Sequence, residues 1–204
     1  MRLLTVLLFL LFSFHSYSQK PSVYFYNHKG ESIDKQTFLD SLKVPNHKYT
    51  YKLIENDTAV LGSLFLREEI NVITQEDRKS IIKELELLSR QKIKDDQTIV
   101  IDFFSYPVTK QTSYDDFFNR YTKNRSYLRF FKKNDGYIHF FVSQKDYTPD
   151  GFIEDKNNYL LKKLFLNYEA SYGNYIIIKP NGHYLRRLGE HRQDEIIDKI
   201  KGDW

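Results

Sequence analysis

The chain of 204 residues contains no cysteine. This absence excludes disulfides, thiol nucleophiles, Cys-x-x-Cys redox centres, cysteine-bound zinc and iron–sulfur clusters. It also excludes a lipid anchor on an N-terminal cysteine. Glycine and proline are scarce, with 8 and 5 residues, and the glycines are too scattered to form a phosphate-binding loop. A chain of this length can bury a sizeable hydrophobic core without covalent cross-links.

Long hydrophobic runs are absent except at the amino terminus. Arg2 precedes an apolar run from Leu3 to Phe14, and small residues follow at Ser16 and Ser18. This pattern is typical of a secretory signal peptide with cleavage after Ser18. The run is about half of the roughly 20 residues that a membrane-spanning helix needs. We therefore expect an exported protein, periplasmic or secreted, with no transmembrane segment in the mature chain.

Neither sign of charge dominates, because 31 basic residues face 27 acidic ones and the formal net charge is +4. One stretch between residues 123 and 133 does combine cations with aromatic residues, as nucleic-acid-binding surfaces do. With so small a net charge, we interpret it as a solvated face over core aromatics and expect no nucleic-acid partner. Its cations are Lys123, Arg125, Arg129, Lys132 and Lys133.

Hydrophobic patterning predicts strands and helices along the first half of the chain. Strands are expected at residues 22–26, 49–55 and 59–66. Asp34 is expected to open a short helix, and Thr74 to cap a longer helix that ends near residue 90.

From residue 98 onward, strands and helices alternate. The pattern predicts a strand at 98–104, a helix from Ser113, a strand at 137–143, a helix at 155–167, a hairpin of 175–178 with 183–186, and a last helix after Gly189. Such an order is typical of an α/β layer structure in which parallel strands acquire an antiparallel edge.

This order of elements resembles the redoxin branch of the thioredoxin superfamily. The segment Ile99–Ser105 looks like the central strand that leads into the family's redox motif, and 173–189 is similar to the family's hairpin and final glycine. The resemblance implies a three-layer α/β sandwich with a central mixed sheet. We expect a signal peptide at 1–18, an N-terminal elaboration of the same domain at 19–96, and a thioredoxin-like core at 97–204.

The residues that carry the family's chemistry are replaced. The two motif cysteines would fall at Val108 and Gln111, and the family's cis-proline would fall near Gly173. Neither valine nor glutamine can supply the thiolate that disulfide exchange needs. The resemblance therefore implies the fold without the activity, with no catalytic residue and no cofactor.

Asp102 lies inside the apolar strand at 98–104, where an ionised carboxylate is costly to bury. In the family, a carboxylate at this place resembles the buried acid that assists proton transfer near the cysteines. Because the cysteines are missing here, we expect Asp102 to be a structural residue satisfied by a hydrogen bond.

The histidines outside the signal segment form no metal-binding motif. No HxxxH or HExxH spacing occurs, so no metal site is predicted, although zinc bound by scattered histidines and carboxylates stays open. These histidines are His28, His47, His139, His183 and His191.

The leading hypothesis for function is a non-catalytic, exported domain that binds a protein or peptide. In the family, the loop after the central strand and the loop before the hairpin frame a groove for extended peptides. Here those loops would present Tyr106 and Pro107 on one side and Tyr172 and Asn174 on the other.

Two alternatives come from other classes of protein. One is a cysteine-independent hydrolase that uses scattered carboxylates with His183 or His191. The other is a module that binds anionic glycan or lipid through Arg186, Arg187 and Arg192. The sequence does not identify the partner, the substrate or the oligomeric state.

Overall fold

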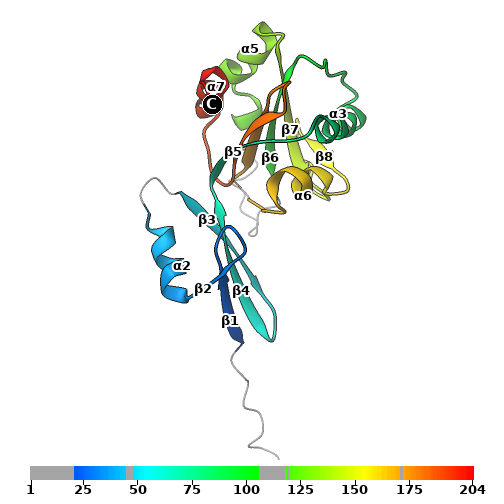
Figure 1. Cartoon of the computed structure of the whole chain (residues 1–204). Coiled ribbons are helices and arrows are strands. Elements are labelled where there is room, and N and C mark those ends of the chain that lie inside the picture. Colours follow the sequence, from blue (N-terminus) through cyan, green and yellow to red (C-terminus); the bar gives the residue numbers. More distant parts are fainter. Residues whose placement is uncertain (1–20, 45–47, 106–117, 119, 171) are drawn as a thin grey trace, which may run out of the picture. The chain divides into compact units, whose positions relative to one another are not determined.

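A computed structural model describes residues 21–44, 48–105, 118, 120–170 and 172–204. The predicted signal peptide lies outside these residues. The chain divides into two compact units, one within residues 1–44 and 51–65 and the other within 45–50 and 66–204 (Figure 1). The segment 19–96 therefore contributes to both units.

The first unit contains a four-stranded sheet in the order β2-β1-β4-β3. Its elements are β1 (Ser22–Tyr26), β2 (Ser32–Ile33), α2 (Lys35–Leu42), β3 (Tyr49–Glu55) and β4 (Ala59–Leu66). The predicted strands at 22–26, 49–55 and 59–66 are confirmed, whereas the two-residue β2 was not expected.

Helix α2 begins where its sequence predicts. The Asp34 side chain accepts the backbone N–H of Thr37 and so caps the first turn. Phe38 of α2 is buried, and its ring centroid lies 4.7 Å from that of Phe25 and 6.0 Å from that of Tyr51. Three aromatic rings thus hold the helix to one face of its sheet.

The second unit contains a six-stranded mixed sheet in the order β5-β10-β9-β6-β7-β8. Its strands are β5 (Glu68–Val72), β6 (Thr98–Phe104), β7 (Tyr137–Gln144), β8 (Ile153–Asp155), β9 (Asn174–Ile178) and β10 (His183–Arg187). Its helices include α3 (Gln75–Ser89), α5 (Arg125–Lys133), α6 (Tyr159–Phe165) and α7 (Gln193–Lys201).

The sheet has the thioredoxin-like arrangement. Strands β6 and β7 are parallel, and the antiparallel hairpin of β9 and β10 lies on the other side of β6. Figure 1 shows α5 and α7 on one face of the sheet and α3 and α6 on the opposite face. The unit is therefore a three-layer α/β sandwich, as the sequence predicted.

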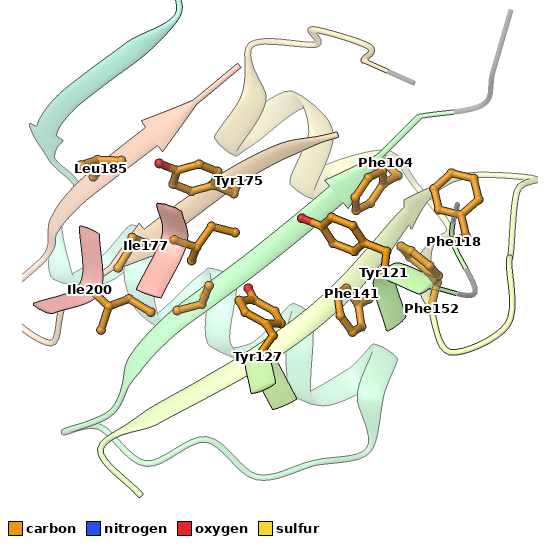
Figure 2. Close-up of a cluster of buried hydrophobic side chains, with 12 residues drawn as sticks. Phe104, Phe118, Tyr121, Tyr127, Phe141, Phe152, Tyr175, Ile177, Leu185 and Ile200 are labelled. Carbon is orange, nitrogen blue, oxygen red and sulfur yellow. The ribbon is translucent and has the colours of Figure 1, made fainter. Parts of the chain in front are cut away.

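Strand β6 lies inside the sheet, and all seven of its residues are buried. Because side chains alternate along a strand, Val100, Asp102 and Phe104 face one helical layer while Phe103 faces the other and contacts Phe165 of α6. The layer toward α5 and α7 is rich in aromatic rings (Figure 2). Each such ring contributes about 1.5–3 kcal/mol by leaving water.

The main differences from the sequence prediction concern the edge of the sheet and the start of helix α6. Strand β10 is not the edge of the sheet, because β5 pairs with it and takes that place. Helix α6 begins at Tyr159 rather than at 155. Asp155 lies in β8 instead, and its carboxylate accepts the N–H groups of Tyr159 and Leu161 at 2.9 and 3.0 Å. The residue expected inside the helix satisfies the free donors of its first turn.

The helix predicted from Ser113 is described only near its end, where residues 120–122 are helical. Asn124 then interrupts it, and its side chain accepts the N–H groups of Ser126 and Tyr127 to start α5. Four of the five cations of the basic cluster therefore lie on a separate helix, whose aromatic residues are turned toward the core. Across the described part of the chain, no helix has the length and apolar character needed to cross a bilayer.

Candidate functional site

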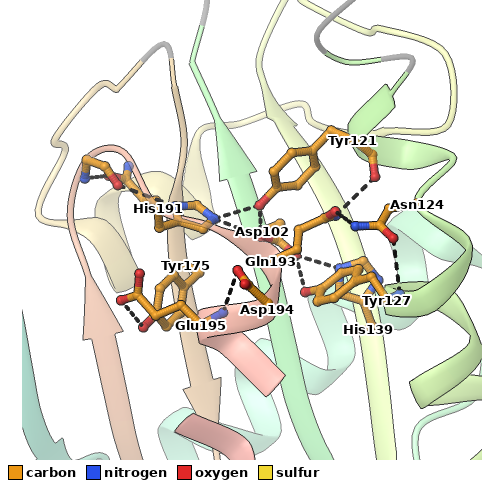
Figure 3. Close-up of polar contacts among 12 residues, drawn as sticks. Asp102, Tyr121, Asn124, Tyr127, His139, Tyr175, His191, Gln193, Asp194 and Glu195 are labelled. Atoms are coloured by element: carbon orange, nitrogen blue, oxygen red, sulfur yellow. Dashed lines mark hydrogen bonds and ion pairs between the residues drawn. The ribbon is translucent and has the colours of Figure 1, made fainter. Parts of the chain in front are cut away.

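The most unusual feature of the interior is the carboxylate of Asp102, which is fully buried in the middle of the sheet. Burying an isolated charge costs several kcal/mol, so it needs compensating donors. Four side chains supply them (Figure 3). We refer to Asp102 with Tyr121, Tyr127, His139 and His191 as the polar hub.

Each oxygen of Asp102 receives two hydrogen-bond contacts. The hydroxyl of Tyr127 donates to Oδ2 at 2.6 Å, and Nε2 of His139 lies 2.7 Å from the same atom. The hydroxyl of Tyr121 donates to Oδ1 at 2.8 Å, and Nε2 of His191 lies 3.0 Å from it. His191 Nε2 is also 2.7 Å from the Tyr121 oxygen. The hub is thus one connected network.

Four separate segments bring these donors to Asp102. His139 is on β7, two positions before Phe141, which pairs with Asp102, so it lies on the same face of the sheet. Tyr127 comes from the buried side of α5, and Tyr121 from the helical residues before it. His191 comes from the segment between β10 and α7.

A second ring of amide contacts fixes the helix ends around the hub. The Gln193 side chain donates to the Tyr121 carbonyl at 3.0 Å, and the Asn124 amide donates to Gln193 Oε1 at 2.8 Å. Nδ1 of His191 lies 3.3 Å from the Gly189 carbonyl, so both ring nitrogens of His191 face oxygen atoms. The orientations of Tyr121 and His191 are therefore set by the surrounding chain.

The hub keeps Asp102 ionised. Burial alone would raise the pKa of Asp102, but the hydrogen bonds and charges of His139 and His191 outweigh it and hold that pKa below the usual value. Burial and the nearby Asp102 charge raise the pKa of Tyr121 and of Tyr127 well above the ordinary tyrosine value. Both phenols therefore stay neutral donors across the physiological range.

The hub has no open position for a substrate. A carboxylate offers about four lone-pair sites, and all four are occupied. The His139 and His191 side chains are only 6% and 0% exposed. Among the residues that the structure describes, no group of three or more histidine and carboxylate side chains has an arrangement that could hold a metal ion. The sequence predicted one hydrogen bond to Asp102, and the structure shows four such contacts.

Only some of the residues predicted for a peptide groove lie within the described part of the chain. Tyr106, Pro107, Val108 and Gln111 lie outside the described residues. Tyr172 is 47% exposed.

Asn174 and Gly173 face the interior. The Asn174 side chain is buried, donates to the Tyr168 carbonyl at 2.9 Å and accepts the Gly189 N–H at 2.8 Å. It therefore ties two loops together and does not offer its amide to a partner. Gly173 has φ +93°, and a Cβ there would lie 2.6 Å from Phe104 Cε1.

The residues named for the hydrolase alternative do not meet. His183 is exposed on β10, whereas His191 is buried in the hub. In the described part of the chain, His139 and His191 share the single carboxylate of Asp102 rather than facing a pair of acids in a cleft.

The three arginines named for anionic ligands are already paired with carboxylates. Arg186 is buried, binds Glu69 and donates to the Leu164 carbonyl. The other pairs are Arg187 with Glu68 and Glu195, and Arg192 with Asp194. These arginines do not form a free cationic surface.

Comparisons with known proteins do not assign the chain to a family. No family model matches the chain, and no curated protein matches it. One solved structure, "Structure of MTB dsbF in its mixed oxidized and reduced forms", overlaps 52% of this chain and 80% of its own, with 12% identity and a TM-score of 0.35. The assignment of the fold rests on the strand order of the six-stranded sheet and not on this overlap.

Proposed function

We propose that the protein is an exported, non-catalytic thioredoxin-like module that binds an extended segment of a partner protein along strand β5. The saturated polar hub and the absence of cysteine support the non-catalytic part. The pattern of residues 1–18 supports export. The open edge of the six-stranded sheet, formed by β5, supports the binding part.

Two hydrogen bonds determine which backbone groups of β5 face outward. The Ile73 N–H donates to the Gly182 carbonyl at 2.9 Å, and the Leu188 N–H donates to the Arg67 carbonyl at 2.7 Å. In an antiparallel pair, bonded and non-bonded positions alternate. Residues 67, 69, 71 and 73 therefore bond β10, and the backbone groups of 68, 70 and 72 point away from it.

The outward side of β5 is available to another strand. In the sheet that the described residues form, β5 is an end strand with no neighbour beyond it. Ile70 and Val72 are 52% and 54% exposed, and β5 has neither the lysine nor the proline that often protects edge strands. The Asn71 side chain does accept the Val72 N–H at 2.8 Å, so one of the outward donors is capped.

Charge does not oppose an incoming peptide at this edge. Glu68 contacts Lys199 at 2.6 Å and Glu69 pairs with Arg186, so both acidic residues of β5 are neutralised. Strand β5 therefore offers two exposed β-branched side chains, Ile70 and Val72, together with outward backbone groups that pair with no other strand of the described sheet. Edges of this kind bind extended peptides by strand addition, with main-chain hydrogen bonds for affinity and alternate side chains for specificity.

Proline at position 70 tests the proposal directly. Ile70→Pro removes an outward N–H while leaving the bonds of residues 69 and 71 to β10 in place, since proline is tolerated at the solvent side of an edge strand. Ile70→Thr is the matched control, because it loses the same apolar side chain and keeps the N–H. The probe is a random peptide display library selected on the full chain.

The expected result is that Ile70→Pro weakens binding of the selected peptides at least tenfold and Ile70→Thr much less. In amide hydrogen-exchange measurements, the same peptides should protect the N–H groups of Glu68 and Ile70. Peptides that instead perturb the loop at Tyr172, and bind Ile70→Pro normally, would overturn the β5 site in favour of the loop groove.

A further inference from the structure

Helix α5 carries a cationic face and has no acidic residue of its own. Its nine residues include four cations and no carboxylate. This local charge of +4 equals the formal net charge of the whole chain. The cations are Arg125, Arg129, Lys132 and Lys133, and all four are exposed.

Helical geometry gathers these cations into one stripe. At 3.6 residues per turn, Arg125, Arg129 and Lys132 fall within an arc of about 60°, with Lys133 beside it. The aromatic residues of α5 lie on the opposite side, where Tyr127 reaches the hub. Leu128 is 38% exposed and borders the stripe.

Helix stability accounts for only part of this arrangement. Lys132 and Lys133 lie in the last turn, where cations interact favourably with the helix dipole. Arg125 lies at the first position, where a cation is disfavoured, and the first turn has no acidic residue. The stripe of cations therefore includes Arg125, although a cation at this position destabilises the helix.

Helix α5 differs from α3 and α7 in having no acidic residue among its cations. None of its four cations has a salt bridge to a carboxylate within the described part of the chain, and Lys201 of α7 adds a further cation over the Phe130 ring at 5.6 Å. By contrast, Arg186 and Arg187 are paired with glutamates. Among the helices α3, α5, α6 and α7, α5 therefore has the largest excess of positive charge.

From this stripe we infer a docking surface for the headgroups of anionic phospholipids. Guanidinium groups bind phosphate through two parallel hydrogen bonds, and each cation near an anionic membrane contributes to attraction. The exposed Leu128 beside the cations favours a bilayer over a fully hydrated polyanion, because an apolar side chain at this place can enter the boundary between headgroups and acyl chains. This surface is independent of the β5 edge.

Vesicle binding by the full chain tests the inference. The probes are phosphatidylcholine vesicles with and without phosphatidylglycerol, measured by co-sedimentation. Two arginines on α5 are replaced in Arg125→Gln/Arg129→Gln. The matched control is Lys79→Gln/Lys83→Gln, which removes the same charge at the same i, i+4 spacing from exposed positions of α3.

We expect binding only to the anionic vesicles, with a loss that grows as salt screens the charges. At about fivefold per cation, the α5 double variant should bind roughly 25-fold more weakly, while the α3 control stays within about twofold of the wild type. Circular dichroism verifies that both variants keep their helices.

Three outcomes would overturn the inference. Equal losses in the two double variants would show that only net charge matters. Equal binding to neutral and anionic vesicles would remove the headgroup preference. Retention on heparin or nucleic acid without binding to anionic vesicles would identify a different polyanion as the ligand.

Discussion

The phenolic oxygen of Tyr127 lies 2.6 Å from Oδ2 of Asp102 in the interior of the second unit. A hydrogen bond to a buried charge is worth about 1.5–3 kcal/mol, more than a bond between neutral groups. Tyr127 therefore joins α5 to the central strand by a polar contact as well as by packing. Predictions about the hub begin from this bond.

Tyr127→Phe should lower the free energy of unfolding of the second unit by about 1.5–3 kcal/mol, because Asp102 loses one of its four donors and no water replaces it. Urea unfolding followed by the fluorescence of Trp204, the single tryptophan of the chain, measures the change. Tyr137→Phe is the control at a half-buried position and should stay within about 0.5 kcal/mol. Equal effects of the two variants would show that the hub bond contributes nothing.

Asp102→Asn should change how stability depends on pH. Because the folded pKa of Asp102 is held below its ordinary value, its charge stabilises the fold above about pH 4, and this contribution is lost as pH falls toward the folded pKa. The stability gap between wild type and Asp102→Asn should therefore be constant near neutrality and shrink by up to about 1.4 kcal/mol per pH unit below about pH 4. Urea unfolding at a series of pH values tests this, and a gap that widens with acid would contradict it.

Gly173→Ala should lower the free energy of unfolding of the second unit by more than the cost of placing an alanine at a positive φ angle. Position 173 has φ +93°, and a Cβ there would lie 2.6 Å from Phe104 and 3.0 Å from the ring of His191. Gly189→Ala is the matched control, since φ is +86° there and nothing lies within 4 Å of the added atom. Overpacking should make Gly173→Ala about 1–3 kcal/mol more costly than Gly189→Ala in urea unfolding. Equal losses of stability in the two variants would mean that the chain around residue 173 shifts to accommodate the added methyl group.

Asn71→Ala should make the β5 edge more prone to pair with a strand of another chain. The Asn71 side chain accepts the outward N–H of Val72, and its removal leaves that donor free to pair with another chain. Sedimentation velocity should show more self-association for Asn71→Ala than for wild type. Asn71→Asp keeps an acceptor for the same N–H and should behave like wild type. Self-association in Asn71→Asp alone would point to another cause.

The sequence predicted the strand at 98–104 well because its apolar run is nearly continuous, as expected of a strand buried on both faces. It missed β5 because Glu68 and Glu69 begin that strand and only Ile70 and Val72 supply the apolar alternation. Edge strands need less burial, so their patterns are weak. A signal for α5 was available in Asn124, which has the side chain of a good N-cap.

Only Asp102, the central residue of the hub, could be predicted from the sequence. A carboxylate inside an apolar strand marked Asp102 as a residue that needs partners, but the identity of those partners was not encoded locally. His139 and His191 lie 37 and 89 residues from Asp102 and share no spacing motif with each other. Their convergence follows from strand pairing and from the return of the chain after β10, which no short pattern reveals.

The origin of the four donors has a consequence for folding. No fragment that ends before residue 191 can satisfy Asp102, because the last donor arrives only with the segment that precedes α7. In partly folded states, the carboxylate of Asp102 would be removed from water without all of its hydrogen-bond donors. The free energy of such states is therefore raised by several kcal/mol. The second unit should consequently fold in a single all-or-none step once residue 191 is part of the chain, and truncation before residue 191 should abolish the native state.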